Sequence, residues 1–208
     1  MDGTQRRRAG PIIDAHAHVY MDDIAQRALR QIASFYGFTG RMHEDACVGT
    51  VDDLLERDTR CGISASLVSE AAHRPELVER LNRFIAQSCR HAEEKGGPRF
   101  YGLCTVHPDC EDIPGILGQA KAEGLRGVKI HPDYQEFDMD DRRCDPIYDF
   151  CREEGFPVLH CGDVRFDFSS PRRLQHVIDR FPGLPLIAAH MGGYRRWDEA
   201  FELRAGET

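Results

Sequence analysis

Short apolar segments alternate with longer amphipathic ones along most of the chain. A continuous apolar run of four to seven residues is typical of a strand that is buried on both faces. The longer segments repeat their apolar residues with the 3.6-residue period of a helix, as Ile24, Ala28 and Ile32 do. The pattern predicts strands at 12–18, 64–69, 100–106, 127–131, 156–160 and 184–190, and helices at 22–35, 51–61, 75–95, 113–123, 147–154, 171–181 and 195–203.

The last three strands recur about every 28 to 30 residues, with one helix between each pair. Such spacing is typical of βαβ units, whose strands run parallel. We therefore expect an α/β fold, with a (β/α)-barrel as the leading architecture and a doubly wound open sheet as the alternative.

Histidines mark the carboxyl ends of the predicted strands. His16 and His18 lie on the first strand, and because side chains alternate along a strand, both point to the same face. Two neutral imidazoles side by side are half of a metal site, although the same pair also occurs by chance. Further histidines end later strands, at positions 107, 131, 160 and 190. In a barrel these strand ends surround one axial pocket, which favours the barrel and a metal site within it.

Composition narrows the possible partners. The 208-residue chain has a formal net charge of -8, which argues against a nucleic-acid surface. No apolar run reaches the roughly 18 residues of a membrane span, and Arg6-Arg7-Arg8 is not followed by a signal-peptide core, so we expect a cytoplasmic protein. The eight cysteines are spread evenly without a Cys-x-x-Cys pair, which predicts reduced, mostly buried thiols.

Four motifs resemble the amidohydrolase superfamily, most closely the amidohydrolase-related branch that includes aminocarboxymuconate-semialdehyde decarboxylase. They are Ile13-Asp14-Ala15-His16-Ala17-His18, Gly127-Val128-Lys129-Ile130-His131-Pro132, Pro157-Val158-Leu159-His160-Cys161-Gly162 and Ile187-Ala188-Ala189-His190-Met191-Gly192-Gly193. The resemblance implies a divalent metal, usually zinc and here one ion rather than two, held by His16, His18 and His160. It also implies that His190 acts as an acid or base on the reactive water or substrate.

The remaining candidate residues are open to two interpretations each. Lys129 is a bridging ligand in binuclear relatives, and otherwise a substrate contact or a buried structural lysine. His131 is a substrate contact or a turn histidine. Asp163 and Arg165 follow the fifth strand, where Arg165 can bind a substrate carboxylate, but a surface ion pair is an equal alternative.

The expected activity is that of a metal-dependent hydrolase, which attacks a C–N or C–O bond of a small molecule through an activated water. A decarboxylase on the same site is the alternative, because a cation also stabilises the negative charge left when CO2 departs. A Schiff-base aldolase using Lys129 and a non-catalytic metal-binding remnant are the other hypotheses.

The chain departs from the family pattern at its carboxyl end. The family's barrel has eight strands and a metal-ligating aspartate at the eighth, whereas six strands are predicted here. We therefore expect a frayed segment at 1–10 and one domain at 11–208, an incomplete barrel of about six βα units from a truncated product. Its open sheet edges would favour association with a second copy.

Overall fold

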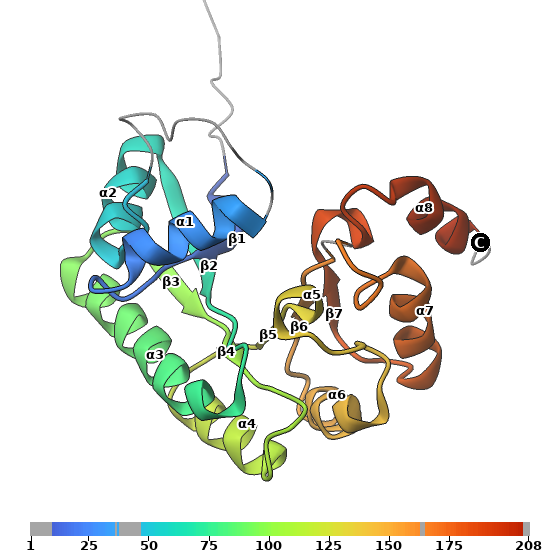
Figure 1. Ribbon diagram of the computed structural model, residues 1–208. Coiled ribbons are helices and arrows are strands. Elements are labelled where there is room, and N and C mark those ends of the chain that lie inside the picture. The colour runs from blue at the N-terminus through green and yellow to red at the C-terminus, as the bar shows by residue number, and fades with distance from the viewer. Residues whose placement is uncertain (1–9, 36, 38–46, 163–164, 206–208) are drawn as a thin grey trace, which may run out of the picture.

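The computed structural model describes residues 10–35, 37, 47–162 and 165–205, so nearly all of the predicted frayed segment at 1–10 lies outside it. Within this part of the chain, strands alternate with helices (Figure 1). The strands are β1 (Ile12–His18), β2 (Ile63–Ser69), β3 (Arg99–Gly102), β4 (Cys104–Thr105), β5 (Val128–Ile130), β6 (Val158–His160) and β7 (Leu186–Ala188). The α-helices are α1 (Ala25–Phe35), α2 (Val51–Cys61), α3 (Val78–Lys95), α4 (Ile113–Ala122), α5 (Pro132–Gln135), α6 (Asp145–Glu153), α7 (Pro171–Arg180) and α8 (Trp197–Ala205), and the 3-10 helices are η1 (Pro75–Leu77), η2 (Arg142–Cys144) and η3 (Ala189–Gly192).

All strand pairs are parallel, in the orders β1-β2-β3 and β4-β5-β6-β7. The two sheets meet at Leu103, whose N–H donates to Val68 O at 2.9 Å, while the next N–H, of Cys104, donates to Gly127 O at 2.8 Å. The backbone thus passes from one sheet into the other and joins them into one array. Among the described strands, β1 and β7 lie at its two ends and do not pair. The predicted α/β class, an incomplete (β/α)-barrel, is confirmed.

The third predicted strand, 100–106, is wrong as a continuous element, because it is divided into β3 and β4. On β4 the side-chain amide of Asn82 takes the place of a neighbouring strand. Asn82 Oδ1 accepts the N–H of Thr105 at 2.7 Å, and Asn82 Nδ2 donates to Thr105 O at 3.0 Å. A polar side chain from α3 therefore interrupts the ladder that the apolar pattern predicts.

The core lies between the strand array and the helices that cover it. Val68 and Ile130 from the strands and Leu117, Ile147 and Val177 from the helices are completely buried. Each such side chain contributes about 1.5–3 kcal/mol when it leaves water. The strand ends are therefore fixed on a rigid frame.

All eight cysteines are free thiols, and half of them are buried. Cys104, Cys144, Cys151 and Cys161 are buried, two others are half-buried, and Cys47 and Cys61 are exposed. None of the described helices has both the length and the apolar character needed to cross a bilayer.

Candidate metal centre and adjoining cavity

The two histidines of β1 converge on one point. Their Nε2 atoms lie 3.2 Å apart. The pairing of β1 with β2 shifts between Asp14 and Ala17, which is a bulge in β1. Within the bulge, Asp14 Oδ1 accepts the N–H of His16 at 3.0 Å. The bulge in β1 therefore fixes the positions of both imidazoles.

A backbone carbonyl determines which nitrogen of His18 is protonated. His18 Nδ1 lies 3.1 Å from Ser69 O, and because a carbonyl only accepts, Nδ1 carries the proton. Its Nε2 then presents a lone pair toward His16. Burial, reinforced by the charges of Lys129 and His16, lowers the pKa of His18 to about 3. His18 is therefore a neutral imidazole with a free lone pair at neutral pH, as metal ligation requires.

Lys129 points from the middle of β5 into the same space. It is completely buried, and its Nζ lies 2.6 Å from His16 Nε2. Because an ammonium only donates, His16 Nε2 also presents a lone pair. The buried Lys129 ammonium therefore occupies the His16 lone pair, and its charge disfavours a proton on the neighbouring His18.

Cys161 and His190 complete the cluster from the other end of the array. Cys161 follows β6 and is buried, and its Sγ lies 3.3 Å from His190 Nε2. The His190 ring lies 5.3 Å from the His16 ring. Burial disfavours the Cys161 thiolate, but the charges of Lys129 and His131 and hydrogen bonds with His131 and His16 hold the pKa of Cys161 well below its usual range. Sequence reasoning identified His190 but missed the thiol beside it.

One set of donor atoms has the spacing of a metal site. The ligand atoms of His16, Cys161 and His190 all lie within 4.8 Å of one another. The other predicted ligands lie close by in the chain: His18 adjoins His16, and His160, completely buried, directly precedes Cys161. Neutral nitrogens and sulfur are donors that suit a zinc-like cation, so the residues present fit a divalent metal.

The other predicted substrate contacts have local partners. His131 begins α5, where its Nδ1 accepts the N–H of Tyr134 at 3.2 Å. Arg165 is exposed, donates to Phe35 O and stacks on the Phe35 ring, with its guanidinium carbon 4.9 Å from the ring centre. Asp163 lies outside the described residues. Arg165 thus connects the segment after β6 to the end of α1.

A cavity of about 280 Å³ opens beside the cluster; His18 of the cluster lines it, and so does His131, which hydrogen-bonds with Cys161. Its walls are mainly apolar and aromatic, with a few charged groups from β2, α1 and α3. The lining residues are His18, Tyr20, Met21, Ile24, Arg27, Ala28, Gln31, Ile32, Phe35, Glu70, Ala71, His73, Leu77, Arg80, Leu81, His131 and Tyr134. The apolar stripe of α1, an ordinary core face by its pattern, therefore faces this space.

Glu70 is the unusual charged group of the cavity. It follows β2, and its Oε2 atom is buried without a hydrogen-bond partner among the described residues. Burial raises the pKa of Glu70 to about 7, against the opposing charge of Arg80. Glu70 can therefore hold or release a proton near neutral pH.

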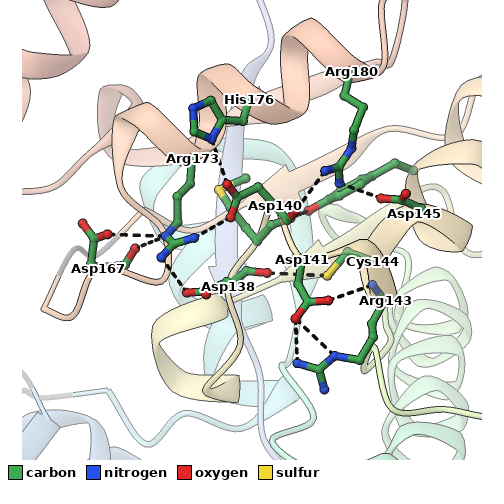
Figure 2. Close-up of polar contacts among 12 residues, drawn as sticks. Asp138, Asp140, Asp141, Arg143, Cys144, Asp145, Asp167, Arg173, His176 and Arg180 are labelled. Atoms are coloured by element: carbon green, nitrogen blue, oxygen red, sulfur yellow. Dashed lines mark hydrogen bonds and ion pairs between the residues drawn. The ribbon is translucent and has the colours of Figure 1, made fainter.

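Ion pairs fix the segments that follow β5 and β6. Arg173 of α7 pairs with Asp138, Asp140 and Asp167, and Figure 2 shows these carboxylates converging on its guanidinium. Arg180, two helical turns after Arg173, donates to Asp145 at 2.6 Å. The network therefore connects α7 to the segments that follow β5 and β6.

Comparison with known proteins decides the family. The profile of the family described as amidohydrolase matches residues 13–206. The chain belongs to the amidohydrolase family. The resemblance predicted from the four motifs is thereby confirmed. A search of curated proteins found no significant match.

Solved structures share the fold of this amidohydrolase at low identity. A TIM-barrel protein from Bordetella bronchiseptica is 17% identical with a TM-score of 0.71, over 94% of this chain and 72% of the other. A 5-carboxyvanillate decarboxylase from Novosphingobium aromaticivorans, with bound manganese, is 19% identical with a TM-score of 0.66, over 95% and 73%. A 4-oxalomesaconate hydratase from Rhodopseudomonas palustris is 17% identical with a TM-score of 0.58, over 93% and 68%.

Proposed function

We propose that this amidohydrolase is a metal-dependent decarboxylase that acts on a small, planar carboxylic acid. The observation that carries the proposal is the cavity, which joins an apolar, aromatic-walled space directly to the imidazole cluster through His18 and His131. The manganese-containing relative named as a decarboxylase supports it. Hydrolysis, the activity expected first from the sequence, is the second candidate.

The cavity walls match both parts of such a substrate. Tyr20, Phe35 and Tyr134 present rings against which a planar molecule can pack. Arg27 and Arg80 line the same space, and a guanidinium binds a carboxylate through two parallel hydrogen bonds. The size of the cavity, about 280 Å³, limits the substrate to a small molecule.

The apolar walls favour loss of CO2 over attack by water. A carboxylate that enters this space loses hydration, whereas CO2 carries no charge to solvate. When the C–C bond breaks, its electron pair stays on the substrate carbon. That carbon then takes a proton, and Glu70 can supply it because the pKa of Glu70 is raised to about 7. Solvent then protonates the Glu70 carboxylate again, so the site returns to its starting state.

The residues on the cluster side of the cavity stabilise the negative charge that develops on the substrate. We expect His16, His18 and His160 to hold the cation, as the family resemblance implies, with zinc as the expected ion. A bound divalent cation would stabilise the charge that develops on the substrate. Lys129, whose Nζ lies 2.6 Å from His16 Nε2, would release that nitrogen to the cation and contact the substrate carboxylate beside it.

Hydrolysis is favoured by one specific observation, the two imidazole nitrogens of His16 and His18 that lie 3.2 Å apart. A metal on neutral imidazoles lowers the pKa of bound water to about 7 and so generates a nucleophile. The two reactions share the site and differ in whether water is added to the substrate.

Product analysis separates them. The full chain, loaded with zinc or manganese, is incubated with a panel of aromatic and unsaturated mono- and dicarboxylic acids and with their amides and lactones. Decarboxylation releases CO2 and lowers the product mass by that amount, whereas hydrolysis adds water. The double variant His16→Ala/His18→Ala is the control and should lose either activity. Turnover without CO2 would replace the proposal by the hydrolase, and no turnover of any kind would overturn both.

A further inference from the structure

We infer that Arg165 holds the carboxyl-terminal half of α1 over the cavity, and that this half moves away when a substrate enters or a product leaves. Arg165 is then a positioning residue, in place of the carboxylate contact expected from the sequence. The inference rests on the proposed function in one respect, since it takes the cavity as the substrate space. It adds the route into that space and the residue that controls it.

The two halves of α1 are held to the rest of the chain in different ways. At its start, Ala25 is 1% exposed, and the N–H groups of Ile24 and Ala25 donate to Met21 O at 3.0 and 2.9 Å. The Leu29 side chain lies beside Gly49. Every residue of α1 after Ala25 is half-buried or exposed. The amino-terminal half is therefore anchored, whereas the carboxyl-terminal half depends on the contacts of its last residue.

The space beneath the carboxyl-terminal half of α1 is the cavity itself. Ile32 and Phe35 line it. The Phe35 ring stands edge-on to the His131 ring at 6.1 Å and to the Tyr134 ring at 6.4 Å between ring centres. A side chain that faces a cavity lacks the packing contacts of a core residue, so this half of the helix moves at a lower cost than a packed helix does. Movement of Phe35 opens the cavity beside His131.

Arg165 supplies the contact that fixes Phe35. Its guanidinium donates to Phe35 O, and the guanidinium carbon lies 4.9 Å from the centre of the Phe35 ring. One side chain thus binds both the backbone and the ring of the last residue of α1. Arg165 is exposed, and a hydrogen bond and a ring contact made by an exposed guanidinium are weak enough to break and form again. The contact can therefore open during each turnover.

The segment that carries Arg165 is firmly attached to the strand array. The N–H of Phe166 donates to Asp133 Oδ2 at 3.0 Å, and the Ser169 hydroxyl donates to Asp133 Oδ1 at 2.8 Å. Asp133 lies in α5, directly after β5, and is 1% exposed. A buried carboxylate with two donors holds this segment in place. Arg165 is therefore the fixed side of the contact, and α1 is the side that moves.

Hydrogen exchange of backbone amides tests the contact without substrate or metal. The wild-type full chain, Arg165→Met and Arg165→Lys are compared by mass spectrometry of peptides from α1 and from α3. Arg165→Met should raise the exchange rate at 32–35 on the order of tenfold, and Arg165→Lys should raise it less, because lysine keeps a donor but lacks the planar surface that stacks on a ring. Arg172→Met, at an exposed arginine of α7, is the control and should match the wild type.

Chemical labelling of Glu70 tests whether the movement opens the cavity. A water-soluble carbodiimide couples glycine ethyl ester to accessible carboxyl groups, and Glu70 lies within the cavity wall. We expect labelling of Glu70 to accelerate in Arg165→Met by about the same factor as exchange in α1. The exposed Glu111 should be labelled at one rate in all variants and serves as the reference.

Each result supports or overturns the inference. Equal exchange of α1 in the wild type and Arg165→Met would overturn the contact. Faster exchange of α1 without faster labelling of Glu70 would overturn the control of entry, and faster exchange of α3 as well would show a general loss of stability and overturn both. Neither measurement uses a substrate, so decarboxylation stands or falls separately in the product analysis.

Discussion

Glu70 carries a pH dependence that a single substitution should remove. Its carboxyl group lies at the end of β2, and its Oε2 atom is buried without a hydrogen-bond partner among the described residues. Burial therefore opposes its ionisation, and the Arg80 charge offsets only part of that effect. Glu70→Gln replaces the carboxyl group with a neutral amide of nearly the same shape.

The magnitude follows from the pKa of Glu70, which is raised from 4.5 to about 7. Each pKa unit corresponds to about 1.4 kcal/mol, so the ionised carboxylate costs the folded state about 3 kcal/mol. Between these two pH values the unfolded chain releases a proton that the folded chain keeps. The free energy of unfolding therefore falls as pH rises from about 4.5 to 7. Above about pH 7 the full cost is present, and below about pH 4.5 it is absent.

Urea denaturation of the wild type and Glu70→Gln at pH 5 and pH 8 measures this difference. We expect Glu70→Gln to gain about 2.5 kcal/mol relative to the wild type between pH 5 and pH 8, because a small part of the cost is already present at pH 5. Glu111→Gln, at an exposed glutamate, is the control and should follow the wild type. A Glu70→Gln curve parallel to that of the wild type over the whole range would refute the reasoning.

Three further substitutions test the frame by the same denaturation measurement. Asn82→Ala leaves the buried N–H and C=O of Thr105 without partners, and at roughly 1–3 kcal/mol for each group we expect a loss of about 3 kcal/mol; a loss below about 1 kcal/mol would contradict the role of Asn82 in dividing the third strand. Gly127→Ala places a Cβ 2.6 Å from Pro157 O, a backbone atom that cannot easily move, so about 1–3 kcal/mol should be lost; an unchanged stability would show that β5 and β6 shift freely. Thr50→Ala removes the cap of α2 and should cost about 1 kcal/mol, with no loss expected from Thr50→Ser.

The strand ends were predictable because their signals are local. An apolar run that ends in histidine places the imidazole at the rim of a parallel sheet, whatever the rest of the chain does. The same is true of α2, where Thr50 accepts the N–H of Asp53 and Gly62 adopts the left-handed conformation that ends the helix. Periodicity and capping rules need only neighbouring residues.

The rest depends on contacts between distant segments. The stripe of Ile24, Ala28 and Ile32 has the same period whether it faces a core or a cavity, so the sequence could not show that this stripe lines the cavity. Arg165 was predicted from its place after a strand, but its partner, Phe35, is 130 residues away. Cys161 gave no motif of its own. Its position directly after His160 was the one available signal.

The separation between α1 and the strand ends has a consequence for how this enzyme can change. The side chains that shape the cavity, such as Ala28 and Ile32, come from α1, whereas His16 and Lys129 come from the strands β1 and β5. Substitutions on the helix alter the size and polarity of the space without moving a ligand atom. For the decarboxylase proposed above, the choice of acid and the chemistry performed on it can therefore evolve independently, and α1 is the place to start a redesign for a new substrate.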